Sequence, residues 1–290
     1  WNYGTNTKVK GNKVPLESSI LNLADRIAVL VDPESEIISQ RSRISKIIKR
    51  NSGLKFNPEL VEMFLELAEK ESFWLSIAKP KLGNQDFYHN IKDERIKLDL
   101  DSLLELSKFF SSIIDFRSRF TATHSRGVAV TAKRIAKLLG WSDHKAKKIE
   151  VAGYLHDLGK LAVPVELLNK RAKLSKKEFN IIKSHVCYRY YILDWLEGLE
   201  EIKRWASFHH ERIDGQGYPF HYSGDQLSVG ARIMAVADVF TAITEDRPYR
   251  EGMKKERAIK VLQSMANEGA LDFEIVGLIT SNYEDLNRIR

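Results

Sequence analysis

The sequence predicts an all-α protein. Apolar residues recur three and four positions apart through most of the chain, whereas the alternating pattern of strands is scarce. Glycine (16) and proline (7) make up about 8% of the 290 residues, below their average usage of about 12%. So few helix-breaking residues favour long helices over a turn-rich β fold. We therefore expect helices packed on one another around an apolar core.

The first expected helices lie in the N-terminal third. Isoleucines recur at helical spacing at 44, 47 and 48, and apolar residues do so again from 60 to 68. A third apolar stripe extends from 103 to 114, and we expect Asp101 or Ser102 to cap the start of that helix. The polar stretch 79–100 interrupts this periodicity and predicts a connector.

The helical pattern continues through the rest of the chain. Apolar residues from 128 to 139 predict a helix that ends at Gly140, since glycine suits helix C-caps. The stretch 149–158 predicts a further helix, and Ser175 with Glu178 forms the pattern of a capping box at the start of another. The glycine-rich stretch 211–230 predicts a loop.

Composition excludes several classes of protein. The hydrophobic and charged fractions, 43% and 29%, are those of a globular chain. One cysteine, Cys187, leaves no intrachain disulfide and no cysteine-cluster metal site. The chain shows neither a membrane-spanning apolar run nor a secretory signal, so we expect a cytoplasmic protein. The net charge of +7 reflects either a solvated lysine-rich surface or a positive electrostatic field that attracts a phosphorylated partner. No motif indicates nucleic-acid binding.

Histidines and carboxylates recur in the C-terminal half. Five of the eight histidines and two aspartates lie in short motifs, namely His124 in TATHS, His156 and Asp157 in YLHDLGK, His185, His209 and His210 in HHERIDGQGYP, and Asp238 in AVAD. The other three histidines lie in polar stretches and are expected at the surface. One histidine on an apolar helix is usually structural, so the prediction of a functional site depends on the combination.

Neutral imidazoles together with carboxylates suit borderline divalent metals such as Fe, Mn, Zn, Ni or Co. Asp157 adjoins His156 and can bridge two ions, and two ions about 3.5–4 Å apart promote in-line displacement at phosphorus. Asp238 lies within the apolar run RIMAVADVF, where an unpaired carboxylate costs several kcal/mol. No nucleophile elbow or Cys/His pair indicates covalent catalysis.

These motifs resemble the HD-GYP family, a branch of the HD phosphohydrolase superfamily. The matching stretches are HSRGVAV, YLHDLGKLAVPVELLNK, KLSKKEF, HHERIDGQGYP, ARIMAVADVFTAI and RPYR, which span about 120–280. The resemblance implies an HD-type helical bundle that hydrolyses the bacterial second messenger cyclic di-GMP to linear pGpG, a step that in the family is often followed by cleavage to GMP. It also implies a dinuclear centre bridged by Asp157, with one ion completed by His124, His156 and Asp238 and the other by His185, His209 and His210.

The same resemblance assigns roles around the metals. Asp157 and Lys160 would be catalytic, with Lys160 on the scissile phosphate. The implied substrate-binding set is Lys160, Arg212, Asp214, Gly217, Tyr218, Pro219, Arg247 and Arg250. Within it, Arg212 and Asp214 would hold the loop in shape, and Arg247 and Arg250 would either contact phosphate or form a structural ion pair.

Three positions depart from the family pattern. Phe120 stands where some members carry a glutamate ligand for a third metal, so we expect two ions, Fe or Mn first and Ni, Co or Zn as alternatives. Thr241 replaces an aspartate outside the ligand set. Arg189 replaces a glycine, and would either alter helix packing or place a positive charge near the substrate.

An internal repeat bears on domain organisation. Residues 14–25 align without gaps with residues 227–238, which pairs Asp25 with Asp238, and 54–67 resembles 270–279. We therefore predict a degenerate, non-catalytic HD-like helical domain over 1–85, a connector over 86–100 and the HD-GYP catalytic domain over 101–290. No histidine occurs within 1–88, so we expect this domain to lack a metal site of its own. We expect it instead to contribute a homodimer contact or to bind a regulatory protein.

Two other interpretations stay open. The substrate could be another cyclic dinucleotide, such as 3',3'-cyclic GMP-AMP, because the GYP string does not separate it from cyclic di-GMP. Alternatively, the protein could be a non-catalytic scaffold that senses a nucleotide through the same site. The complete ligand set argues against that second interpretation.

Overall fold

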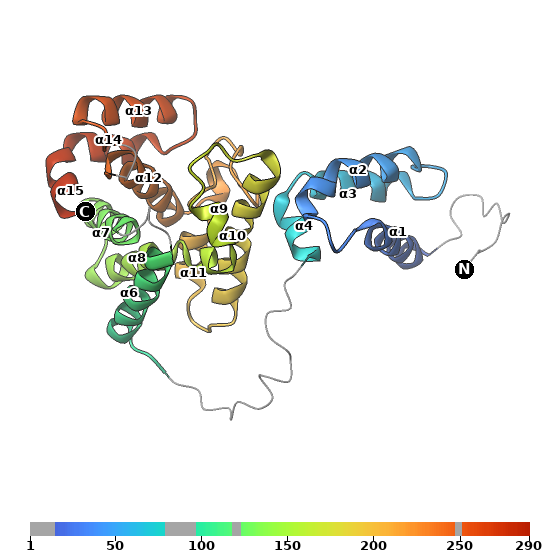
Figure 1. The fold of residues 1–290 in the computed structure, drawn as a ribbon, viewed down its shortest axis with the longest axis horizontal. Helices are drawn as coiled ribbons and strands as arrows, with labels where there is room; N and C mark the ends of the chain where they lie inside the picture. The colour runs from blue at the N-terminus through green and yellow to red at the C-terminus, as the bar shows by residue number, and fades with distance from the viewer. Residues whose placement is uncertain (1–14, 79–96, 118–122, 247–250) are drawn as a thin grey trace. The chain divides into compact units, whose positions relative to one another are not determined.

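The computed structural model describes residues 15–78, 97–117, 123–246 and 251–290 (Figure 1). Every regular element in these ranges is helical, and the isolated β-bridge that they contain joins Ser52 and Phe56. The predicted all-α fold is therefore confirmed. By its internal packing the chain divides into two compact units, Trp1–Ala78 and Lys79–Arg290. Most of the connector expected over 86–100 lies outside the described residues.

The N-terminal unit contains four described helices, α1 (Leu16–Leu30), α2 (Ile37–Arg50), α3 (Pro58–Ala68) and α4 (Glu71–Ile77). Helix α2 packs against both α3 and α4. Trp74 is fully buried between them and donates its indole N–H to the carbonyl of Ala68 at 2.9 Å. In α1, Leu23 and Ile27 are buried but Asp25, which the repeat pairs with Asp238, is exposed.

The second unit carries the remaining described helices, α6 (Leu100–Arg117), α7 (His124–Leu138), α8 (Asp143–Leu155), α9 (Val165–Leu168), α10 (Lys176–Asp194), α11 (Glu200–Ser207), α12 (Val229–Thr244), α13 (Lys255–Asn267), α14 (Phe273–Ser281) and α15 (Tyr283–Ile289). Two short 3-10 turns, η1 (Leu158–Ala162) and η2 (Gly224–Gln226), complete it. No described helix combines the length and the apolar character needed to cross a bilayer.

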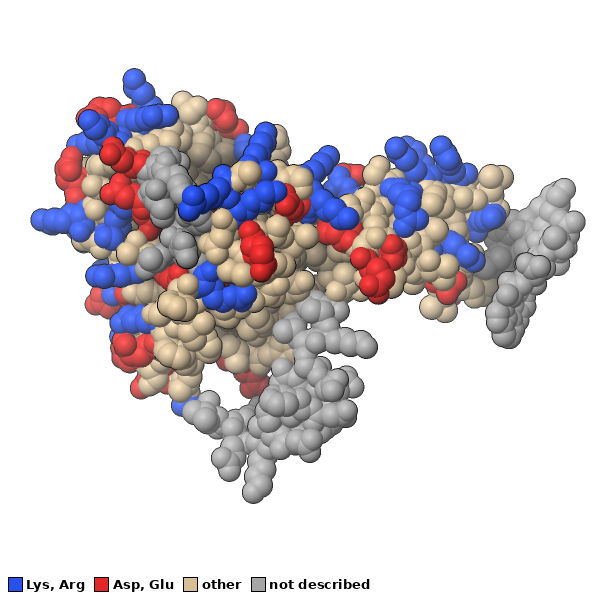
Figure 2. Space-filling model, in the orientation of Figure 1, with Lys and Arg blue, Asp and Glu red and all other residues tan. Residues whose placement is uncertain are grey.

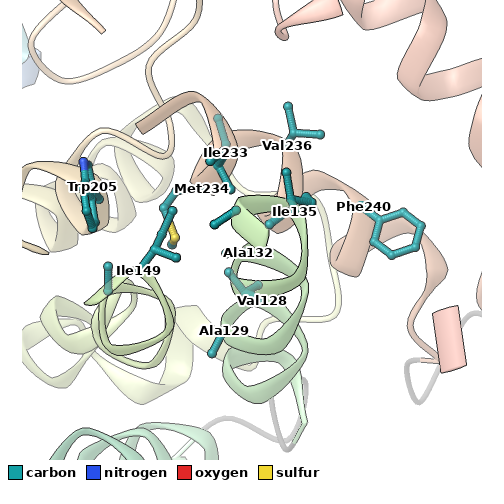
Figure 3. Packing of buried hydrophobic residues seen from close by; sticks show 14 of the residues in the cluster. Val128, Ala129, Ala132, Ile135, Ile149, Trp205, Ile233, Met234, Val236 and Phe240 are labelled. Atoms are coloured by element: carbon teal, nitrogen blue, oxygen red, sulfur yellow. The ribbon is translucent and has the colours of Figure 1, made fainter. Parts of the chain in front are cut away.

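The core of this unit lies where α7, α8 and α12 meet. Figure 3 shows apolar side chains of α7 and α12 facing one another, with Ile149 of α8 and Trp205 of α11 beside them. Each fully buried valine, isoleucine, methionine or phenylalanine side chain stabilises the folded state by about 1.5–3 kcal/mol. The three helices form one packed frame. Four of the expected metal ligands, His124, His156, Asp157 and Asp238, lie at its helix ends and along α12.

Two predicted helix caps are confirmed. The hydroxyl of Ser175 accepts from the backbone N–H of Glu178, whose carboxylate accepts from the N–H of Ser175, so a capping box starts α10. Gly140 has the positive φ of a helix C-cap after α7.

Two predicted boundaries were wrong. Helix α6 begins at Leu100, because the carboxylate of Asp99 accepts from the N–H of Ser102 at 2.8 Å and acts as the cap in place of Asp101 or Ser102. The helix expected over 149–158 ends at Leu155, where the chain turns into η1.

Candidate metal centre

Five segments of the second unit bring the expected ligands together. His124 is the first residue of α7, the His156–Asp157 pair follows the end of α8, and Asp238 lies in the middle of α12. The other three expected ligands are His185 on α10 and His209 and His210 just after α11. Each position follows from a helix start, a helix end or an inward helix face, which is why distant motifs converge on one place.

The ligand atoms form two groups of three. His124, His156 and Asp238 make one group, and His185, His209 and His210 make the other; within each, the ligand atoms lie within 4.8 Å of one another. A third, overlapping group contains Asp157 with His156 and His209.

The carboxylate of Asp157 lies between the two groups. Its Oδ2 is 3.3 Å from Nε2 of His156, a member of the first group, and its Oδ1 is 3.8 Å from Nε2 of His185, a member of the second. One oxygen therefore lies near each group, which is the arrangement that a bridging carboxylate requires.

Backbone carbonyls orient three of the imidazoles. The Nδ1 atoms of His156, His185 and His209 each donate to the carbonyl three residues earlier, at 2.6–2.7 Å. With Nδ1 protonated, Nε2 keeps a lone pair. The Nε2 atoms of His185 and His209 are buried and find no hydrogen-bond partner among the described residues, a cost of about 1–3 kcal/mol each. Such orphaned acceptors fit a divalent metal ion.

Burial keeps the second group neutral. It lowers the pKa of His185 and His209 well below the usual value, and the neighbouring His210 lowers both further. Burial likewise lowers the pKa of His210 to about 4. Metal binding requires the neutral imidazole, so all three side chains are held in the binding form.

The first group carries a different charge pattern. Nε2 of His124 lies 3.1 Å from Oδ1 of Asp238, and its Nδ1 lies 3.4 Å from Oε2 of Glu245. Burial alone would lower the pKa of His124, but these two carboxylates raise it to about 9. A proton on His124 thus occupies the position that a divalent cation would take between this imidazole and Asp238.

Neighbouring side chains keep Asp157 ionised. Burial would raise its pKa, but His156 and Lys160 hold it well below the usual range. The Nζ of Lys160 pairs with Oδ2 of Asp157.

The centre is exposed on one side. The side chains of His210, Lys160 and Asp238 are 25%, 20% and 14% exposed. Those of His124, His156, Asp157 and His185 are 5% exposed or less. A ligand would therefore approach over His210 and Lys160.

The GYP loop lies at that exposed side. The buried carboxylate of Glu211 accepts from the N–H groups of Phe220 and Tyr222 at 2.8 and 3.0 Å, which fixes the loop beyond the cis Tyr218–Pro219 peptide. A Cβ at Gly217 would lie 2.4 Å from Cα of Glu211, so a larger residue would collide with the backbone there.

Two of the expected substrate contacts pair with each other. Arg212 and Asp214 form an ion pair at 2.6 Å, and Asp214 also accepts from the N–H of Gln216 at 2.9 Å, within the same loop. The other pair of arginines, Arg247 and Arg250, lies outside the described residues, as does Phe120. Thr241 is buried in α12, where its methyl group lies against Gly127 of α7.

Near the centre lie two residues for which the sequence predicts no role, Glu245 and Asp115, and one for which it allows two roles, Arg189. Glu245 ends α12, contacts His124 and accepts a hydrogen bond from the Thr123 hydroxyl at 2.5 Å. Asp115 on α6 is buried 3.0 Å from the Ser125 hydroxyl, and burial raises its pKa to about 6. Arg189 is fully buried, which decides for a packing role over a substrate contact.

Comparisons with known proteins agree with these motifs. A family model described as HD domain matches residues 108–275. The chain is 32% identical over 274 residues to the 3'3'-cGAMP-specific phosphodiesterase 1 of Vibrio cholerae, covering 91% of this chain and 63% of that protein. It is 39% identical over 142 residues to a cyclic di-GMP phosphodiesterase of Pseudomonas aeruginosa, covering 49% of this chain and 34% of the relative.

Among solved structures, a cyclic GMP-AMP specific phosphodiesterase of V. cholerae aligns with a TM-score of 0.46 and 28% identity, covering 97% of this chain and 64% of that one. The chain thus spans less than two thirds of the length of each of these three proteins.

Proposed function

The chain belongs to the HD domain family, and from that premise we propose that it is an HD-GYP phosphodiesterase that hydrolyses a cyclic dinucleotide with two divalent metal ions. The observation that supports this most is the position of Asp157 between two complete groups of ligands. One metal site would need only one group. The second group and the shared carboxylate are what a dinuclear centre adds.

The protein's own residues prepare the reaction. His156, His185 and His209 present fixed Nε2 lone pairs, and Asp157 stays ionised. Lys160 places a point charge at the exposed side, one helical turn from Asp157, where it can pair with a phosphoryl oxygen. Two divalent ions in this centre would supply Lewis-acid activation of water and neutralise charge on the phosphoryl group. Iron and manganese are the first candidates, with nickel, cobalt or zinc as alternatives.

The proposed substrate is a 3',3'-cyclic dinucleotide that contains guanine. Cyclic di-GMP, cleaved to pGpG and on to GMP, is the first candidate, and the P. aeruginosa relative named for it has the higher identity. 3',3'-Cyclic GMP-AMP is the second candidate, because the V. cholerae relative named for it matches 91% of the chain, including the N-terminal unit.

For the N-terminal region we propose a non-catalytic role. The groups of described side chains that could hold a metal ion all lie in the second unit. We keep 1–85 as the degenerate HD-like domain, 86–100 as the connector and 101–290 as the catalytic domain, and propose that the first domain contributes a homodimer contact or binds a regulatory protein.

The test is hydrolysis by the purified chain. The protein is reconstituted with Mn(II), or with Fe(II) under anaerobic conditions, its metal is counted, and cyclic di-GMP and 3',3'-cyclic GMP-AMP are supplied separately. We expect about two metals per chain and formation of linear dinucleotide. Two bound metals without turnover of either nucleotide would refute the proposed substrates, and tight nucleotide binding by a metal-free protein would favour the scaffold.

A further inference from the structure

A line of aromatic and cationic side chains leads outward from the exposed side of the metal centre. The ring of Tyr218 stacks on His210, with centroids 4.8 Å apart and an interplanar angle of 28°. The ring of Phe179 meets Tyr218 edge to face at 6.2 Å. The Nζ of Lys183 lies 5.0 Å from the Tyr218 centroid and 5.3 Å from that of Phe179. The line therefore starts at an expected metal ligand and reaches solvent.

Helix α10 fixes this arrangement relative to the metal centre. Phe179 and Lys183 are four residues apart, so they are neighbours on one helix face, and His185 follows within the next turn. The capping box at Ser175 fixes the start of the same helix. The distance from the ring of Phe179 to the centre is thus set by one rigid element.

The ring of Phe179 is 42% exposed although it lies at the entrance of a charged site. A single exposed phenylalanine needs no explanation by itself. This one also contacts Tyr218 and a lysine ammonium, and both contacts leave part of the ring open to solvent. Aromatic rings beside cations are the surfaces on which nucleotide bases stack.

Positive charge surrounds the start of α10. Six basic residues and one acidic residue occur between positions 170 and 183, the basic ones being Lys170, Arg171, Lys173, Lys176, Lys177 and Lys183. Figure 2 shows Lys and Arg side chains gathered over the part of this face where Figure 1 places α9 and α10. A field of this sign raises the local concentration of a substrate with two phosphates.

We propose that Phe179 and Lys183, together with Tyr218, form a platform that binds a purine base of the substrate while a phosphate of the same nucleotide lies at the metal centre. Phe179 stacks on the base, and the Lys183 ammonium donates to the acceptors on its edge. The inference rests on the proposed function and adds to it the residues that select a purine.

The test compares two variants with two matched controls. Phe179→Ala removes the stacking ring, and Lys183→Gln removes the charge. Phe273→Ala alters another exposed phenylalanine, on α14, and Lys260→Gln alters an exposed lysine on α13, outside the basic set at the start of α10. Metal content is counted for every protein, and KM and kcat are measured for cyclic di-GMP and for cyclic di-UMP, whose bases are pyrimidines.

We expect Phe179→Ala to raise KM for cyclic di-GMP by about 10- to 100-fold, the usual effect of losing one base-stacking ring, with kcat and metal content close to wild type. Its preference for cyclic di-GMP over cyclic di-UMP should shrink, because pyrimidines stack less strongly. Lys183→Gln should raise KM by a smaller factor, and both controls should match wild type.

Other outcomes separate the platform from the proposed function. If Phe179→Ala is active and keeps the wild-type KM and purine preference, the platform is refuted but the proposed function is not. A loss of kcat or of bound metal at unchanged KM would likewise refute only the platform. If the wild type hydrolyses neither nucleotide, equilibrium binding of cyclic di-GMP replaces KM. Weaker binding of cyclic di-GMP by Phe179→Ala would then support the base-binding platform and refute only the hydrolytic activity. No binding by the wild type would refute both the platform and the proposed function.

Discussion

The guanidinium of Arg189 on α10 donates a hydrogen bond to the backbone carbonyl of His156, at the point where α8 ends. The Arg189 side chain is fully buried, and its Nε also lies 3.5 Å from the hydroxyl of Ser207 on α11. Burial lowers its pKa to about 10, so the group stays charged at neutral pH. One side chain on α10 thus contacts the end of α8 and the end of α11, and all three segments carry or adjoin expected ligands.

Substitution of Arg189 should loosen these segments together. Arg189→Gly removes the bond to His156 and leaves a cavity, and we expect a loss of about 2–5 kcal/mol in the free energy of unfolding, typical of large-to-small core changes. Metal affinity should fall as well, because the His156–Asp157 pair loses its anchor. Urea unfolding and metal titration measure the two effects. If the glycine variant unfolds with the wild-type free energy, the buried arginine makes no net contribution to stability.

Removal of Asp157 should abolish metal retention and turnover together. Asp157→Ala deletes the carboxylate that lies between the two ligand groups, and neither group alone replaces it. The measurement is metal content by elemental analysis alongside hydrolysis of cyclic di-GMP.

His144→Ala serves as the control for Asp157→Ala, because His144 is an exposed histidine on α8. It should keep both metal and activity. Full activity of Asp157→Ala with about two metals per chain would contradict the dinuclear arrangement.

The seven expected ligands could be proposed from sequence because most lie in short motifs with unusual chemistry, such as adjacent His and Asp, that resemble the HD-GYP pattern. Glu245 carries no such pattern: it contacts His124 across more than a hundred residues of chain, and only the packing of α12 on α7 brings the two together. The same applies to Asp115 beside Ser125, since an aspartate at a helix end is normally solvated. The sequence shows that Arg189 departs from the glycine of the family pattern. Whether its side chain points into the core or toward the substrate depends on how the helices pack.

Gly159 should not tolerate a side chain. A Cβ there would lie 1.8 Å from the carbonyl oxygen of His185 and 2.9 Å from the backbone N of Arg189, so η1 and α10 would have to separate. We expect Gly159→Ala to destabilise the protein by about 1–3 kcal/mol or more and to displace His185. Thermal unfolding and metal counting test this.

Gly277→Ala is the matched control for Gly159→Ala. Gly277 lies within α14, and nothing lies within 4 Å of its added Cβ. It should stabilise the helix by up to about 1 kcal/mol. Equal effects of the two substitutions would contradict the close approach at Gly159.

Asp115 should make stability of the metal-free protein depend on pH. Burial raises its folded pKa to about 6 from an unfolded value of 3.8, so the folded state holds the proton more tightly. Its contribution to stability is therefore greatest below about pH 4 and is lost as pH rises through 6. Asp115→Asn removes this loss, and its Tm should exceed that of wild type by more at pH 8 than at pH 5. An equal difference at both pH values would contradict the assignment.

Glu245 should set metal affinity through His124. Its Oε2 lies 3.4 Å from Nδ1 of His124, while the opposite ring nitrogen faces Asp238 and the expected metal. A carboxylate on the far nitrogen of a ligand orients the ring and increases its basicity, and its loss typically costs 10- to 100-fold in metal affinity. Glu245→Gln keeps the shape but not the charge, so we expect about that loss by competitive chelator titration, with little change in Tm.

Two further variants show whether the Glu245→Gln effect is specific. Glu62→Gln, at an exposed position of α3, should bind metal like wild type. Thr123→Val removes the hydroxyl that donates to Glu245 at 2.5 Å, and it should lower metal affinity in the same direction but by less, because the carboxylate remains. If Glu245→Gln retains wild-type metal affinity, then His124 is held by Asp238 and its helix alone, and Glu245 contributes only to packing at the end of α12.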